Sequence, residues 1–301
     1  MRKVLFATTA LVALGGVSAA SADISVSAAN EFKYKSWSDN TAETGGTNKN
    51  SFANTTSYKI SASTVTDNGL SMSSYTAQDG STGAFDDMGF SIAGDFGTIG
   101  FAGSEAGDKF ATATDVTPDE ANTLTTASAA LTALPADEHL DAADISYLSP
   151  NISGFQFSLG VTDTAGYNDT SSMGAQYSMT SGDTTVTIKY ATSEKGVATS
   201  SATAIEATSL GLVFAYGDTT VTLGQNTKSM GSSYDYTGDA VGITHKMSDS
   251  LTISAYTGST EDAKDSTHEI SDTGLGLAYT ITPGLKLSVT HNDWDLKDAS
   301  A

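Results

Sequence analysis

Most of the residues in this sequence that could do chemistry are carboxylates, and many of them lie in one segment. The 301 residues include 35 Asp and Glu against 14 Lys and Arg. Segment 105–142 carries eight of the acids: Glu105, Asp108, Asp115, Asp119, Glu120, Asp137, Glu138 and Asp141. A cluster of carboxylates can attract cations. From the residues alone, a solvated surface loop is the simpler interpretation.

The sequence gives little support for enzymatic chemistry. There is no cysteine, which excludes thiol catalysis and Cys-ligated metals. Neither H-E-x-x-H nor G-x-S-x-G occurs. The histidines are dispersed: His139, His245, His268 and His291. We therefore expect no catalytic residue and no cofactor. Calcium at the acidic residues Glu261, Asp262 and Asp265 stays open, because hard cations favour carboxylate oxygen, although no EF-type loop is present.

The charge and composition exclude several classes of protein. The formal net charge is −21 and the pI is about 4.2, whereas nucleic-acid binding requires a basic footprint. A hydrophobic content of 39%, with 12 Tyr and 11 Phe, argues against disorder. The length fits one large β domain or two smaller domains.

Residues 1–22 have the pattern of a secretory signal peptide. Arg2 and Lys3 form a basic start, Val4 to Val17 an apolar stretch, and Ala20-Ser21-Ala22 a cleavage signal. The alternative is a transmembrane anchor, which needs about 20 apolar residues. Cleavage predicts a mature chain of residues 23–301, exported across an inner membrane.

The rest of the chain reads as antiparallel strands whose two faces differ. In residues 23–37, Ile24, Val26 and Phe32 share one parity, and Ser25 and Lys33 share the other. Side chains two residues apart lie on the same face of a strand. The same alternation recurs along the chain and predicts about 15 strands, each roughly as long as the 9 to 11 residues of a spanning strand.

Short and long connections alternate between these strands. Short turns are predicted at 67–69, 95–97, 149–154, 181–183, 217–219, 247–250 and 282–284. The longer connections fall at 39–50, 79–85, 105–142, 163–170, 193–203, 226–234 and 258–267. A transmembrane barrel has this asymmetry, whereas a soluble sandwich does not require it. The apolar parity carries the bulk, so we expect it to face lipid while the Ser- and Thr-rich parity lines a wet channel.

The longest connection, 105–142, lies between strands predicted at 97–104 and 144–148. A connection of this length is usually functional. Thr117-Pro118-Asp119-Glu120 has the form of a helix start, because Thr117 can cap, Pro118 fits the first position and Glu120 closes a capping box. A short helix over 121–134 would end at Pro135.

At this point the chain resembles a known family. The signal peptide, the alternating strands, the long connection after the fifth strand, and Gly94-Asp95-Phe96-Gly97-Thr98-Ile99-Gly100 are similar to general porins of Gram-negative outer membranes, alphaproteobacterial type. Asp144-Ile145-Ser146-Tyr147-Leu148-Ser149-Pro150 followed by Gly154-Phe155 adds to the likeness. The resemblance covers essentially the whole mature chain, 23–301.

The resemblance implies a 16-stranded transmembrane antiparallel β-barrel, usually a homotrimer in outer-membrane lipid. Its third loop, 105–142 here, folds into the pore and forms a constriction. In the family, acidic loop residues face basic wall residues across this constriction. The corresponding acids are the eight listed above, and the wall candidates are Lys33, Lys35, Lys59 and Lys189. Lys246 and Lys286 share the same parity on later strands.

Two features depart from the family pattern. The predicted mature chain has no arginine and a net charge of −23, so we expect a cation-preferring pore. The chain also ends at Asp293 to Ala301, which reads as the start of an external loop and not as a final strand with a terminal aromatic residue. We therefore expect one loop and one strand to be missing, unless a strand has been miscounted.

The resulting functional prediction is passive diffusion of ions and small hydrophilic solutes through an outer-membrane channel. A secreted or surface-exposed β-rich adhesin without channel activity is the alternative.

Overall fold

The computed structural model describes residues 9–11, 22–37, 49–78, 87–104, 107–111, 143–163, 169–195, 205–231 and 234–297. The chain divides into two compact units. Unit 1 comprises Met1–Asp95 with Gly100–Gly103, and unit 2 comprises Phe96–Ile99 with Ser104–Ala301. Each unit is described by itself below.

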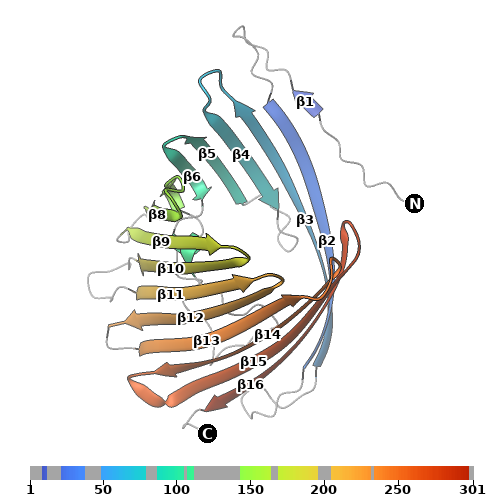
Figure 1. Cartoon of the computed structure of the whole chain (residues 1–301), viewed down its shortest axis with the longest axis vertical. Coiled ribbons are helices and arrows are strands. Elements are labelled where there is room, and N and C mark those ends of the chain that lie inside the picture. The colour runs from blue at the N-terminus through green and yellow to red at the C-terminus, as the bar shows by residue number, and fades with distance from the viewer. Residues whose placement is uncertain are drawn as a thin grey trace. The chain divides into compact units, whose positions relative to one another are not determined.

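In unit 1, consecutive strands pair in antiparallel fashion from β1 to β5. These strands are β1 (Thr9–Leu11), β2 (Ala22–Trp37), β3 (Lys49–Val65), β4 (Ser71–Gln78) and β5 (Asp87–Gly94). The alternating residues of 23–37 form β2, and Figure 1 shows β2 and β3 as long neighbouring arrows. β1 lies inside the predicted signal peptide and pairs with the first residues of β2.

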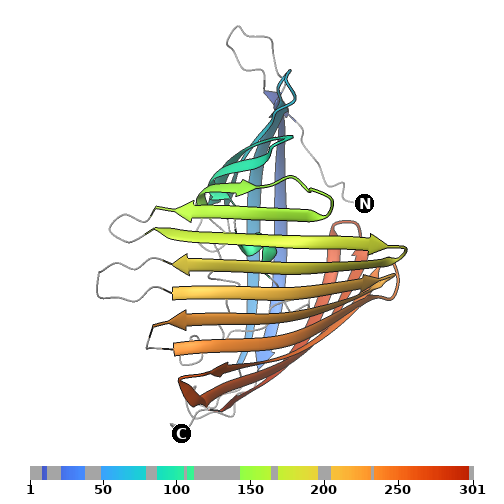
Figure 2. The same ribbon diagram turned by 60° about the vertical axis from the view of Figure 1, so that its left-hand side comes forward.

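The residues of β6 (Gly97–Ser104) are divided between the two units. In unit 2 a 3-10 turn, η2 (Gly107–Phe110), precedes ten further strands among the described residues. They are β7 (Ala143–Leu148), β8 (Phe155–Thr162), β9 (Thr170–Ser181), β10 (Thr184–Lys195), β11 (Ile205–Tyr216), β12 (Thr219–Met230), β13 (Tyr234–Lys246), β14 (Leu251–Asp262), β15 (Asp265–Thr282) and β16 (Leu285–Lys297). Figure 2 shows β9 to β16 as successive arrows that alternate in direction.

The strand order in the sheet is the order in the chain, β1 to β16. Among the described residues, fifteen strands follow residue 21, as the alternation predicts, and all seven short turns occur at the predicted positions. Gly69, Gly182, Gly217 and Gly284 in these turns have positive φ, a conformation that glycine adopts without the penalty of a Cβ atom. No helix in the described part of the chain is long and apolar enough to cross a membrane.

Three predicted boundaries were wrong. The expected long connection at 226–234 is largely strand, because β12 continues to Met230. The one at 258–267 is a tight hairpin in which only Ala263 and Lys264 separate β14 from β15. Residues 293–297, expected to begin a loop, belong to β16. In all three places the strand ladder continues beyond the residues whose apolar side marks a strand in the sequence.

Candidate functional site: the polar face of the strands

The strands of unit 2 bury small polar side chains and expose large apolar ones. On β11, Ser209 is 1% exposed and its neighbour Leu210 is 49% exposed. On β8, Ser158 is 1% exposed and its neighbour Leu159 is 47% exposed. A water-soluble sheet buries its apolar face instead. The apolar face is therefore suited to lipid, and the polar face is the inner wall, as the alternation predicts.

In unit 1 the apolar face of the first strands carries an exposed aromatic group. The Phe52 ring centroid lies 5.7 Å from that of Phe32 and 4.9 Å from that of Tyr34. All three side chains are more than half exposed. Exposed aromatic groups of this size are typical of a surface that meets lipid or another protein.

On the polar face, hydroxyl and amide groups bond across neighbouring strands. Ser178 and Thr187 share a hydrogen bond of 2.7 Å, and Thr180 and Thr185 one of 3.0 Å. Gln176 Nε2 donates to a Gln156 side-chain oxygen at 3.0 Å. Such cross-strand pairs fix the side chains along the wall and keep it hydrophilic.

The predicted basic wall residues of unit 1 do not form one compact cluster. Lys33 Nζ lies 3.3 Å from Glu31 Oε1, and Lys59 Nζ lies 4.3 Å above the centre of the Tyr75 ring. Lys59 is paired with Ser27 in the strand register, six residues before Lys33. At about 3.4 Å per residue, the two lysines are separated by roughly 20 Å along the strands. Of Lys35 the structure describes only the backbone, which is in β2.

Lys189, the fourth basic candidate, lies on the polar face of β10 in unit 2. In the register its neighbours are Gln176 on β9 and Gly211 on β11. Its side chain is half-buried. It is therefore a wall residue of unit 2.

The long connection begins by folding against the sheet. Its first turn, η2, contacts β8, β9 and β10, and Phe110 at the end of this turn is 2% exposed. On these strands the buried side chains, such as Ser172 and Ser193, belong to the polar face. The start of the connection therefore covers the inner wall of unit 2, which agrees with a loop that folds into the pore.

The acidic candidates on this loop lie mostly outside the described residues. Asp108 is in η2, and only its backbone is described. The predicted helix at 121–134 and the remaining acids also lie outside the described residues: Glu105, Asp115, Asp119, Glu120, Asp137, Glu138 and Asp141. Their place opposite the basic wall stays a prediction.

One arrangement on the wall was not predicted from the sequence. The Tyr256 hydroxyl on β14 donates to Asp272 Oδ2 on β15, and the Tyr256 ring lies against Gly274. Tyr256 is 8% exposed. A sequence signal exists, because an aromatic residue on the polar parity faces a glycine, but it becomes readable only once the strand register is known.

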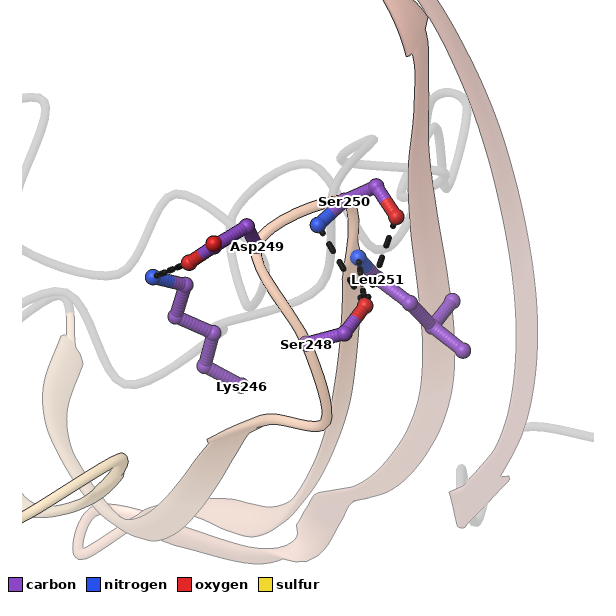
Figure 3. A network of polar contacts seen from close by, with 5 residues as sticks. All are labelled: Lys246, Ser248, Asp249, Ser250 and Leu251. Carbon is purple, nitrogen blue, oxygen red and sulfur yellow. Dashed lines mark hydrogen bonds and ion pairs between the residues drawn. The ribbon is translucent and has the colours of Figure 1, made fainter.

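A polar network closes the turn between β13 and β14 (Figure 3). Lys246 Nζ lies 2.9 Å from Asp249 Oδ1, and Ser248 Oγ accepts the backbone N–H groups of Ser250 at 3.3 Å and Leu251 at 3.2 Å. The hydrogen bond and the charge of Lys246 lower the pKa of Asp249.

Two of the acidic and histidine side chains considered in the sequence have other partners in the structure. Within the described ranges, no three His, Asp or Glu side chains are placed to hold a metal ion. Asp262 Oδ1 instead accepts the backbone N–H groups of Asp235 at 2.9 Å and Lys264 at 3.0 Å. His245 Nδ1 shares a hydrogen bond of 2.9 Å with Thr219 Oγ1.

An antiparallel sheet with an apolar outer face, a hydrophilic inner wall and a connection folded onto that wall defines an outer-membrane channel protein. The comparisons with known proteins agree. The family model described as Gram-negative porin matches residues 7–299. The chain belongs to this Gram-negative porin family, and membership implies a channel rather than an enzyme.

Solved structures support the same fold at low sequence identity. The anion-selective porin from Comamonas acidovorans is 12% identical with a TM-score of 0.65, and the match covers 92% of this chain and 90% of that chain. OmpT, an outer membrane protein of Vibrio cholerae, is 11% identical with a TM-score of 0.67 and coverage of 94% and 90%. A triple mutant of Rhodopseudomonas blastica porin is 14% identical with a TM-score of 0.58, and the match covers 89% of this chain and 94% of that chain. No curated protein sequence matched.

Proposed function

We propose that this protein forms a water-filled channel in the bacterial outer membrane for passive diffusion of ions and small hydrophilic solutes. The observation that carries the proposal is the placement of buried Ser and Thr side chains on one face and exposed Leu, Ile and Phe on the other. Such a wall excludes lipid and provides a hydrophilic path. Membership of the porin family supports the same function.

We infer further that the channel prefers cations. The sequence carries a large excess of carboxylates, and Arg2 in the predicted signal peptide is its single arginine. The acids of loop 105–142 would raise the local cation concentration at the constriction. The fold does not decide the sign, since one structural neighbour at 12% identity is named an anion-selective porin.

Export by cleavage of residues 1–22 and assembly as a homotrimer complete the proposal. A trimer form has been solved for the OmpT protein of Vibrio cholerae, which is 11% identical. The exposed aromatic group of Phe32, Tyr34 and Phe52 is available for contact with lipid or with a neighbouring subunit.

Conductance across a planar lipid bilayer tests the channel, and the reversal potential in a KCl gradient tests its selectivity. We expect stable conductance steps and a reversal potential displaced toward the K⁺ equilibrium potential. Folded protein that does not conduct would contradict the channel. A displacement toward the Cl⁻ potential would contradict cation preference while leaving the channel intact.

A further inference from the structure

A pocket of about 340 Å³ lies on the inner wall at the end of unit 2 where the short turns are. Thr252 and Ser254 of β14, Ala278 and Thr280 of β15, and Lys286 of β16 line it, together with Asp249 and Ser250 of the adjoining turn. All five strand residues belong to the polar face, opposite the exposed Leu277, Tyr279 and Leu285.

The strand register explains why the wall is hollow here. Thr252 is paired with Ala278, and Ser254 with Gly276. Thr280 is paired with Lys286 in turn. Ala278 and Gly276 on the middle strand contribute little or no side chain to this face, and Ser254 opposite Gly276 is small as well. Lys286 on β16 is the longest side chain of the lining.

The pocket has hydrogen-bonding capacity that the described residues do not use. Ser254 is 8% exposed, and its Oγ has no hydrogen-bond partner within the described part of the chain. Thr252 and Thr280 also line the pocket and add two further hydroxyl groups to it. An unsatisfied buried hydroxyl costs free energy, so a bound water or solute group at this point is favourable.

The lining carries one Asp and one Lys, so the pocket lacks the carboxylate excess of the chain as a whole. The Asp249 carboxylate is already held by Lys246 at 2.9 Å. No ion pair of Lys286 is found within the described residues, and its side chain is exposed. A carboxylate on an incoming solute can therefore pair with the Lys286 ammonium while neighbouring hydroxyls of the solute reach Thr252, Ser254 and Thr280.

We propose that this pocket is a binding subsite for a small hydroxylated monocarboxylate, a sugar acid in chemical class. The subsite would bind such anions inside a channel whose overall negative charge disfavours their entry. The proposal rests on the proposed function only in that the polar face borders water.

Saturation-transfer NMR on the folded protein in detergent tests the subsite directly. Gluconate is the probe, and sorbitol, which has similar hydroxyl groups but no carboxylate, is the uncharged control compound. We expect saturable gluconate binding. Lys286→Gln should weaken this binding about tenfold, because one charge-assisted hydrogen bond is lost. Ser254→Ala should weaken it about threefold, by loss of one neutral hydrogen bond. Lys286→Arg should retain most of the binding, and heat-modifiable migration verifies the fold of each variant.

Lys189→Gln is the matched control, because it removes the same charge from the polar face of β10, outside the pocket. An equal loss in Lys189→Gln and Lys286→Gln would overturn the subsite in favour of general electrostatics. Equal binding of gluconate and sorbitol, or no saturable binding, would overturn it in favour of a pocket that holds only water. Conductance of the same samples in KCl tests the channel separately.

Discussion

The Tyr256 ring lies against Gly274 of the neighbouring strand so closely that a Cβ atom at position 274 would overlap it. The glycine lets the ring lie flat along the inner wall with its hydroxyl bonded to Asp272. An aromatic side chain on the wall thereby occupies little of the space inside. Glycine is needed at position 274 because of the neighbour across the strand and not because of the backbone conformation.

We predict that Gly274→Ala destabilises the fold by about 1 to 3 kcal/mol, because the added methyl group must displace the ring. Urea titration of the protein refolded in lipid vesicles measures this loss. Tyr256→Ser removes the obstacle, so adding Gly274→Ala to that variant should cost much less. An equal cost in both backgrounds would refute the contact as the cause.

A second prediction concerns pH at the turn between β13 and β14. Lys246 lowers the pKa of Asp249, chiefly through their hydrogen bond. The contribution of the pair is therefore present at neutral pH and is lost as pH falls through the lowered pKa of Asp249. Carboxyl carbon NMR should give Asp249 a lower midpoint in the wild type than in Lys246→Gln; identical midpoints would exclude the interaction in solution.

The orientation of the two faces predicts opposite results for neighbouring residues on β11. Leu212 belongs to the exposed apolar face, and Val213 to the polar face. Leu212→Lys should cost about 2 to 4 kcal/mol if its position is near the bilayer midplane. Val213→Lys should fold normally and change the ion selectivity instead. Vesicle refolding and reversal potential distinguish them, and a reversed pattern would mean that the faces are assigned wrongly.

Glu194 and Glu206 lie directly opposite each other on β10 and β11, with both side chains exposed. Like charges in this position destabilise a strand pair. We expect Glu206→Gln to stabilise the fold by about 0.2 to 1 kcal/mol. The same substitution in a Glu194→Gln background should have a smaller effect, and salt should reduce both. Additive effects in this double-mutant cycle would show that the two charges do not interact.

The loop acids can be tested although most lie outside the described residues. If these acids lie at the constriction as proposed, replacing Asp115, Asp119 and Glu120 by their amides should lower the ratio of K⁺ to Cl⁻ permeability, because the constriction then loses three carboxylates. The double variant Glu194→Gln and Glu206→Gln, on the exposed apolar parity, serves as the control. If both sets change the ratio equally, selectivity arises from total charge and not from the loop.

Much of the fold was predictable because lipid on one side and water on the other impose a period of two residues on each strand. Ile188 and Lys189 show this on β10, where one is exposed and the other half-buried. The same signal fails in β14 from Gly258 onward, where Ser259 and Glu261 make the outer face polar as well. The hydrogen-bonded ladder continues there, but the alternation that announces it has ended. Strand ends were therefore the main errors.

The site was predictable as a face but not as a set of contacts. Parity places Lys33 and Lys59 on the same side of the sheet, yet only the register reveals their separation by six residues. The pocket at Lys286 and the contact of Tyr256 with Gly274 likewise depend on which residues stand opposite one another. Turn lengths and pairing, which set the register, carry information that composition does not.

The alternation of the two faces also affects how the unfolded chain can reach the outer membrane. Because every second side chain is polar, the strands beyond residue 22 do not form a continuous run of apolar residues long enough to stop in the inner membrane as a helix. The unfolded chain can thus pass through an aqueous compartment, and lipid becomes favourable only when neighbouring strands pair and satisfy the backbone groups together. We therefore expect insertion into lipid to be coupled to strand pairing.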